Sequence, residues 1–288
     1  MNFGQKFSTG GKIFTTLIIL FMLFSSVYAK KITFAFTGTT LKEDLKTYLL
    51  WQRYLEKNSH FDIGIKFART YAEVISSIKD EKTDIAYVCS STYMILRDKK
   101  NARLLAIPII NGKDKYYSYV IALKKSKYKS LLDFKGKIYA FTDPGSNSGA
   151  IAPTYFLLKK GYKVNTFFRN LVYTYDHGES IKAVIDGFVD GASVDSLVYT
   201  QYIKKHPSAT KKLRIVQKLG SFTISPIVIR YNINKKEFKK LQDLFLNMNK
   251  TKIGKEILNH LNIERFVKPS NQEYTKIYQM QKYIKEHK

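Results

Sequence analysis

The sequence predicts an α/β protein of two lobes, each with a mixed, mostly parallel sheet flanked by helices, joined by two crossings of the chain. Short apolar strand patterns alternate with helical periods from residue 32 onward, which is the order of βαβ units in parallel sheets. Later strand patterns at Ile215–Leu219 and Ser225–Ile229 carry the chain back to the part built first. A cleft between the two lobes is therefore the expected ligand site.

Residues 1–29 are interpreted as a secretory signal peptide. Lys6 and Lys12 form a basic start, and residues 13–24 are apolar apart from two threonines. The segment ends at Ala29, a small residue of the kind found at signal-peptide cleavage sites. The apolar run is shorter than the roughly 18 to 20 residues of a membrane-spanning helix. An uncleaved anchor remains the alternative, but we expect an exported protein.

The charge balance favours anionic partners without locating a site. The chain has 49 Lys and Arg against 23 Asp and Glu, a formal net charge of +26. Such a balance suits nucleic acid, an anionic membrane or a small anionic ligand, and export argues against nucleic acid. The lysines are scattered as pairs over most of the predicted helices, which is typical of solvated surface.

The single cysteine, Cys89, excludes an internal disulfide, so stability must come from core burial. Cys89 is expected to be a buried small residue beside a strand. It is also far from the predicted cleavage point, where a lipid anchor would need a cysteine.

The first part of lobe I is assigned to residues 30–120. Its helices repeat apolar residues at helical spacing and its strands alternate or run apolar. The last strand is the expected point of exit from the lobe. The predicted strands are Ile32–Phe36, Asp62–Phe67, Asp84–Cys89, Leu104–Ile110 and Tyr117–Leu123, and the predicted helices are Leu41–Lys57, capped at Thr39-Thr40, and Tyr71–Lys79.

Lobe II is assigned to residues 121–220, and residues 221–288 return to lobe I. Gly161 and Gly187 are expected to end helices in the second lobe. From Lys235 onward the pattern is helical throughout. The elements predicted for lobe II are strands at Lys137–Phe141, Gly191–Val194 and Ile215–Leu219 and helices at Ala150–Lys160, Glu179–Asp186 and Leu197–Lys205.

The loop Asp143–Gly149 is predicted to bind an anion. It lies between a strand and a helix, and it holds two glycines, two serines and a turn-forming Asp-Pro. This order directs unpaired backbone N–H groups and the positive end of a helix dipole at one point. The hydroxyls of Ser146 and Ser148 are expected to add donors there.

The sequence argues against catalysis, metal binding and cofactor binding. Ser148, His177 and Asp190 supply the residue types of a hydrolytic triad, but Asn147 occupies the nucleophile position of Gly145–Gly149 and the chain order is wrong. The five histidines are far apart, no cysteine cluster exists, and the loop lacks the Gly-Lys-Ser/Thr ending of a P-loop. We therefore expect no enzyme, no metal site and no cofactor.

The segment Ala140–Gly149 resembles the signature of the phosphate/phosphite/phosphonate class of ABC-transporter substrate-binding proteins. Asp84–Tyr87 resembles the Asp-Val/Ile-Ala-Trp strand of that family, and Tyr117–Tyr119 resembles its aromatic-Ser crossing segment. Asp133–Lys137 and Val189–Ala192 are similar to two further landmarks, in the family's order. The resemblance covers nearly the whole chain after the leader.

The resemblance implies a type II periplasmic-binding fold that closes on an oxyanion and presents it to a membrane permease. The expected protein is a periplasmic monomer that binds a phosphonate, phosphite or phosphate and has no nucleic-acid partner. A ligand-sensing protein of the same fold, acting with a membrane sensor kinase, is the alternative.

The resemblance also implies which residues form the pocket. Asn147 departs from the family pattern, which more often has Thr there, and Cys89–Thr92 departs from the family's Gly-Pro or Gly-Asn turn. Asp190 is a candidate to accept a proton from the ligand, with a surface ion pair as the alternative, and Asp195 is a candidate helix N-cap. The pocket residues are expected to be Ser146, Asn147, Ser148, His177, Tyr71, Tyr116, Asp190, Ser90 and Ser91.

Overall fold

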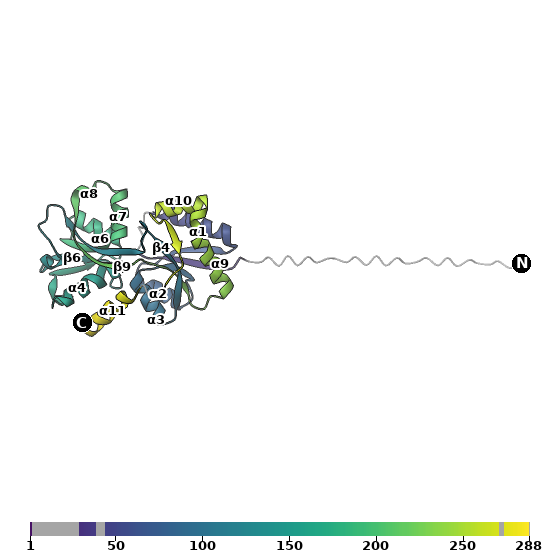
Figure 1. Ribbon diagram of the computed structural model, residues 1–288, viewed down its shortest axis with the longest axis horizontal. Helices are drawn as coiled ribbons and strands as arrows, with labels where there is room; N and C mark the ends of the chain where they lie inside the picture. The colour runs from purple at the N-terminus through teal and green to yellow at the C-terminus, as the bar shows by residue number, and fades with distance from the viewer. Residues whose placement is uncertain (2–28, 39–43, 271–273, 288) are drawn as a thin grey trace.

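The computed structural model describes residues 1, 29–38, 44–270 and 274–287 and arranges them as two lobes, each built on one sheet (Figure 1). The predicted signal peptide and the predicted cap at Thr39-Thr40 lie outside the described residues, apart from the first and last residues of the leader. Within the described ranges, no helix is both long and apolar enough to cross a membrane.

The first lobe has a six-stranded sheet in the order β11-β4-β10-β3-β1-β2. Strand β1 pairs in parallel with β2 and β3, and β10 joins antiparallel between β3 and β4. Its strands are β1 Lys31–Phe36, β2 Asp62–Phe67, β3 Ile85–Tyr87, β4 Ala102–Ile109, β10 Ile227–Arg230 and β11 Arg265–Val267. Its helices are α1 Leu45–Ser59, α2 Tyr71–Lys79, α3 Ser90–Asp98, α9 Lys235–Leu246, α10 Lys252–His260 and α11 Thr275–His287, with a short 3₁₀ turn at Met248–Lys250.

The second lobe has a five-stranded sheet in the order β7-β6-β8-β5-β9. Strand β6 is parallel to β7 and β8, whereas β5 is antiparallel to β8 and β9. Its strands are β5 Lys115–Leu123, β6 Ile138–Phe141, β7 Asn170–Tyr173, β8 Gly191–Asp195 and β9 Leu213–Thr223. Its helices are α4 Ala152–Lys159, α5 Val164–Phe167, α6 His177–Ile185, α7 Ser196–Lys205 and α8 Ala209–Lys212, with a 3₁₀ turn at Leu131–Phe134 and a π-helical turn, η3, at Asn147–Ile151.

Two crossings of the chain join the lobes, as predicted. One runs from β4 to β5 and the other from β9 to β10, and they lie side by side because the Ile224 N–H donates to the Asp114 carbonyl at 2.9 Å. The strands change sheet at residues 110–114 and 224–226. The lobe limits at 120/121 and 220/221 remain a proposal.

An aromatic core ties the C-terminal segment to the first lobe. The fully buried Trp51 of α1 packs edge-on against Phe34 of β1 and Phe245 of α9, with ring centroids 5.2 and 5.8 Å apart, and its ring also lies 5.9 Å from Phe266 of β11. The return of the chain therefore completes the first hydrophobic core.

Two predictions about the elements were wrong or incomplete. The pattern after Lys235 is not helical throughout, because β11 pairs antiparallel with the edge of β4 and buries Phe266. Helix α3 was not predicted, since its first turn is Ser90-Ser91-Thr92, three polar residues that are all buried.

The lobes are closed on each other through side chains far from the crossings. Asp44, just before α1, accepts a hydrogen bond of 2.7 Å from Gln201 of α7 and forms an ion pair with Lys205 of the same helix. Lys204 also donates to the Asn262 side chain at 2.9 Å. Each contact joins the second lobe to the first.

Candidate functional site

The loop Asp143–Gly149 folds as a strand-to-helix turn at the carboxyl end of β6. The Asp143 carboxylate accepts the Gly145 N–H at 2.7 Å, and the Ser146 hydroxyl caps η3 by accepting the Gly149 N–H at 3.0 Å. The helix begins at Asn147, earlier than the predicted Ala150, and its first turn is π-helical, a form frequent at functional sites. The loop therefore places Asn147 and Ser148 at a helix N-terminus that the Ser146 side chain caps.

Close packing explains the second glycine of the loop. A Cβ atom on Gly149 would lie 2.4 Å from Thr142 Oγ1 and 2.6 Å from Thr142 Cβ, closer than real Cβ atoms approach. Glycine therefore lets the helix start sit directly on the end of β6. The same Thr142 hydroxyl lies 2.9 Å from Nδ1 of His177, so this packing also sets the distance between the loop and the histidine.

Among the buried side-chain polar atoms that have no hydrogen-bond partner within the described residues, four belong to predicted pocket residues. They are the Tyr71 hydroxyl, Asn147 Oδ1, the Ser148 hydroxyl and His177 Nε2. Each of these side chains is at most 1% exposed. A buried polar atom without a partner costs about 1–3 kcal/mol, so such atoms are rarely left in folded proteins without a ligand or water to satisfy them. The four atoms come from both lobes: Tyr71 begins α2 of the first lobe, where its N–H donates to Asp143, and the other three residues belong to the second lobe.

The hydrogen bonds of His177 fix its protonation state. Its Nδ1 atom accepts the backbone N–H of Asp195 at 3.2 Å, and a backbone N–H can only donate. The ring proton is therefore on Nε2, the atom without a partner. Burial lowers the pKa of His177 from 6.5 to about 3, so the ring is neutral and offers one N–H donor.

The predicted residues Ser90 and Ser91 of the first lobe and Tyr116 of β5 are already hydrogen-bonded within the protein. Tyr116 accepts a hydrogen bond from Asn147 Nδ2 at 2.8 Å and lies 3.1 Å from the Ser90 hydroxyl. The Ser91 hydroxyl donates to the Gly145 carbonyl at 2.5 Å. Cys89 is buried as predicted, and its sulfur accepts the Asn147 N–H at 3.3 Å. Ser91 and Cys89 position the loop from the first lobe, and Tyr116 positions it from β5 of the second sheet.

Asp190 is not brought to this cluster. Its carboxylate accepts the Ile138 N–H at 2.9 Å and the Tyr128 hydroxyl at 3.3 Å, at the start of β6 and β8. At about 3.3 Å per residue, a five-residue strand places Asp190 about 16 Å from Asp195 at the other end of β8. The surface ion pair with a lysine is not found either, because both oxygens accept bonds that hold the second sheet together.

Asp195, and not Asp190, is the carboxylate next to His177 at the cleft end of β8. It is 4% exposed, and its carboxylate caps α7 by accepting the Leu197 N–H at 2.7 Å, while its own N–H binds His177. Burial raises the pKa of Asp195 from 3.8 to about 7. The signal that could have identified it is position, because ligands of α/β sheets bind at the carboxyl ends of the strands.

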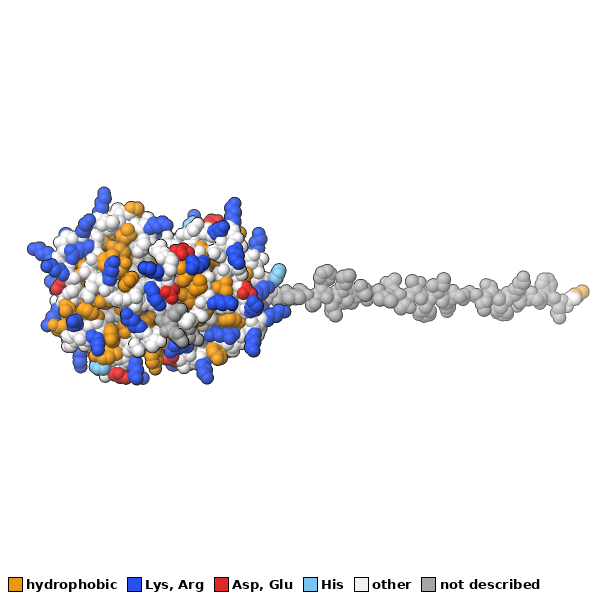
Figure 2. Space-filling view, in the orientation of Figure 1, with side chains coloured by type: hydrophobic (Ala, Val, Ile, Leu, Met, Phe, Trp, Pro, Cys, Tyr) orange, Lys and Arg blue, Asp and Glu red, His pale blue; other side chains and the backbone are white. Residues whose placement is uncertain are grey.

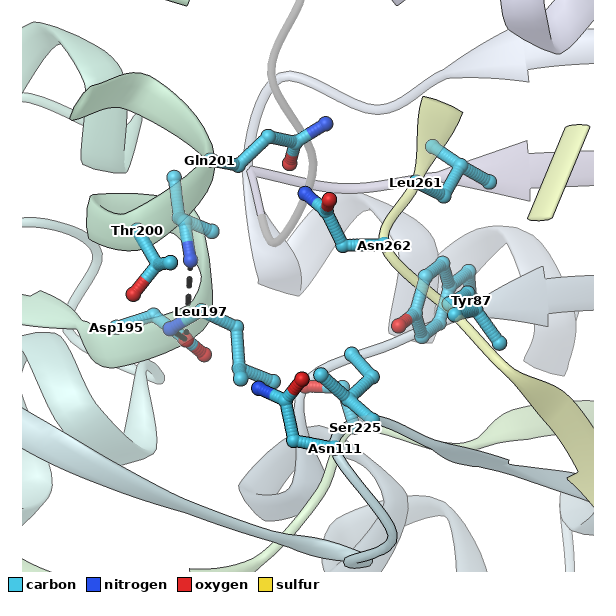
Figure 3. A pocket seen from close by; sticks show the side chains of 12 residues that line it. Tyr87, Asn111, Asp195, Leu197, Thr200, Gln201, Ser225, Leu261 and Asn262 are labelled. Carbon is cyan, nitrogen blue, oxygen red and sulfur yellow. Dashed lines mark hydrogen bonds between the residues drawn. The ribbon is translucent and has the colours of Figure 1, made fainter. Parts of the chain in front are cut away.

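A cavity of about 160 Å³ lies between the lobes next to Asp195 (Figure 3). Asp195, Thr200 and Gln201 line it from the second lobe, and Tyr87 and Asn262 line it from the first. Asp195, whose N–H binds His177, therefore lies between the unpartnered atom of that histidine and a cavity lined by both polar and apolar side chains. Among the described residues, no group of three His, Cys, Asp or Glu side chains is placed to hold a metal ion.

Comparisons with known proteins agree on one family. A family model described as "ABC transporter, phosphonate, periplasmic substrate-binding protein" matches residues 34–274. The phosphonates-binding periplasmic protein of Escherichia coli is 28% identical over 260 residues, which cover 86% of this chain and 76% of that protein.

Two solved structures share the fold. A binding-protein component of an ABC phosphonate transporter from Pseudomonas aeruginosa superposes with a TM-score of 0.83 at 23% identity, covering 89% of this chain and 87% of that one. PhnD1 from Prochlorococcus marinus, in complex with methylphosphonate, superposes with a TM-score of 0.80 at 20% identity, covering 89% and 98%.

Proposed function

Because the chain belongs to the family of periplasmic phosphonate-binding proteins of ABC transporters, we propose that it captures a phosphorus oxyanion between its lobes and delivers it to an ABC permease. The observation that carries this proposal is the set of four unpartnered buried atoms on Tyr71, Asn147, Ser148 and His177. The relatives named for phosphonates and crystallised with methylphosphonate support the ligand class.

The donor set suits an oxyanion. The Tyr71 and Ser148 hydroxyls and the Nε2–H of His177 are three neutral donors from three different elements, as a tetrahedral anion with several oxygens requires. Hydrogen bonds to an ionised acceptor are short and about twice as strong as neutral ones. Binding restores a partner to each donor, which makes ligand capture favourable and draws the lobes together.

The acceptors indicate the charge state of the ligand. Among the described residues, no Lys or Arg side chain forms a hydrogen bond with the loop or with His177, whereas the carboxyl groups of Asp143 and Asp195 are both buried close by. Asn147 Oδ1 adds an acceptor with no partner. We infer that the site prefers a monoanion that still carries a P–OH, or a ligand with an amine, because a dianion would face carboxylates without a counter-ion.

The remaining parts of the proposal concern export and the working unit. Residues 1–29 act as the signal peptide, the protein works in the periplasm, and a single chain suffices because it supplies both walls of the site. It binds its ligand without turnover, without a cofactor and without nucleic acid.

Calorimetry with phosphate, phosphite, methylphosphonate and 2-aminoethylphosphonate tests the proposal. We expect at least one to bind wild-type protein and Ser148→Ala to weaken that binding roughly tenfold, the effect of losing one hydrogen bond to a charged group of about 1.5 kcal/mol. Ser77→Ala is the matched control, since Ser77 is a buried hydroxyl bonded to Thr83 in the first lobe. No binding of any of the four, or equal affinity in wild type and Ser148→Ala, contradicts the proposal.

A further inference from the structure

The edge of the second sheet that points away from the first lobe gathers cationic side chains. Strand β5 ends at this edge and β6, β7, β8 and β9 begin there, because Leu123 pairs with Leu213, Ala122 with Gly191, and Ile138 with Asn170. The candidate ligand site lies at the opposite edge. The residues that flank these strand ends and are exposed are Lys124, Lys125, Lys127, Lys137, Arg169, Lys211 and Lys212, which we call the distal basic edge.

Backbone hydrogen bonds bring these cations together although they are far apart in sequence. The Lys124 N–H donates to the Lys212 carbonyl at 2.7 Å, and the Arg169 N–H donates to the Lys137 carbonyl at 2.9 Å. Asp190 lies between the two pairs, but its carboxylate is engaged by Ile138 and Tyr128 and forms no ion pair with them. Among the ion pairs of the described residues, none includes a member of the distal basic edge.

An exposed aromatic side chain stands at the same edge. Phe188 is 74% exposed, more than any other large hydrophobic side chain of the described residues after Met1. It follows α6, and its N–H donates to the Ala183 carbonyl at 2.9 Å while the Gly187 N–H donates to Val184. In this helix ending the residue at the position of Phe188 commonly packs back on the helix. Here it points into solvent two residues before Asp190.

We propose that the distal basic edge, with Phe188, docks the protein on an anionic phospholipid membrane surface. Each Lys or Arg near an anionic lipid surface contributes about 1 kcal/mol, and aromatic side chains insert at the headgroup level. An edge of exposed cations with one exposed Phe fits such a surface, whereas a small-anion site would need converging donors. Figure 2 shows blue cationic side chains projecting at this end of the molecule, as they also do elsewhere on the visible face. Docking here leaves the cleft between the lobes uncovered.

Vesicle co-sedimentation tests the proposal, with full-length wild-type protein, vesicles of phosphatidylglycerol and phosphatidylcholine, and vesicles of phosphatidylcholine alone. The edge variant is Lys124→Gln, Lys125→Gln, Lys211→Gln and Lys212→Gln. The control variant is Lys57→Gln, Lys79→Gln, Lys235→Gln and Lys236→Gln, four exposed lysines of the first lobe with the same change in charge. Any leader that remains is common to all three proteins.

We expect wild-type protein to bind the anionic vesicles and not the neutral ones. The edge variant should lose at least tenfold in partitioning, the control variant less than threefold, and Phe188→Ser should weaken binding most at high salt, where charge is screened. Equal losses in the two lysine variants, binding to neutral vesicles as strong as to anionic ones, or no vesicle binding overturn the proposal. Retention by an acidic protein but not by anionic vesicles also overturns it.

Discussion

The Asp143 carboxylate of the second lobe accepts a hydrogen bond of 3.0 Å from the backbone N–H of Tyr71, the first residue of helix α2 in the first lobe. Its other oxygen accepts the Gly145 N–H within the loop. One buried carboxylate thus fixes the shape of the loop and joins it to a helix N-terminus across the cleft, where a negative charge is favourable. This bond exists only when the lobes are closed.

Replacing Asp143 with Asn should therefore weaken ligand binding. The amide can accept from only one of the two N–H groups at full strength, and a buried unpaired N–H costs about 1–3 kcal/mol. We expect methylphosphonate to bind roughly 5- to 100-fold more weakly, with a smaller closed fraction in small-angle scattering. Asp133→Asn is the control, because Asp133 also accepts two backbone N–H groups but within the second lobe alone. Equal effects of the two substitutions on affinity would rule out a role in closure.

His177 gives a pH-dependent prediction. Its folded pKa of about 3 lies below the unfolded value of 6.5, so its contribution to stability is present above pH 6.5 and is lost as the pH falls towards 3. His177→Asn keeps an acceptor near Nδ1 but removes the titration and the Nε2 donor. Denaturant unfolding from pH 4 to 7 should show wild type gaining stability over this variant by about 1.4 kcal/mol per pH unit, levelling near pH 6.5. A pH-independent difference would contradict the neutral buried histidine.

Asp195 should make the free energy of unfolding change with pH in the opposite direction to His177. Its pKa is raised to about 7, so its contribution to stability is present below pH 3.8 and is lost as the pH rises through 7. Asp195→Asn keeps a good N-cap for α7 and removes the titration. We expect the variant to be more stable than wild type at pH 8 and to lose this advantage progressively towards pH 4. Chemical denaturation of both proteins at pH 4, 6 and 8 tests this prediction. A difference in the free energy of unfolding that does not change with pH would contradict the buried, shifted carboxyl group.

Strong periodicity allowed some elements to be predicted with their exact bounds, and tertiary contacts decided the rest. Helix α2 begins and ends as predicted, because Thr70 caps it and Val74 and Ile78 form one apolar face. Strand β11 has only three residues and exists because it pairs with β4. Helix α3 was missed because its polar first turn packs against the loop of the other lobe, a contact without a periodic signal.

The candidate site shows the same division. The loop, His177 and Tyr71 follow from residue types and from family resemblance, and the structure joins Tyr71 to the loop through Asp143 and His177 to the end of β6 through the Thr142 hydroxyl. The choice between Asp190 and Asp195 depends on which end of β8 faces the cleft. The rule that ligands bind at the carboxyl ends of strands would have favoured Asp195, and the pairing of β8 with β5 and β6 fixes this orientation. The partners that occupy Ser90 and Ser91 likewise appear only once the lobes are closed.

The ion pair of Asp44 and Lys205 gives the last prediction, because it closes the lobes away from the ligand. Asp44 is 6% exposed and also accepts from Gln201, so both bonds break when the lobes separate. The apparent dissociation constant rises in proportion as the closed fraction falls. Lys205→Met should therefore weaken methylphosphonate binding roughly tenfold and mainly speed its release, measured by stopped-flow fluorescence. Lys239→Met, which removes an ion pair inside α9, is the control and should leave both values unchanged. An unchanged release rate in Lys205→Met would show that these side chains do not hold the lobes together.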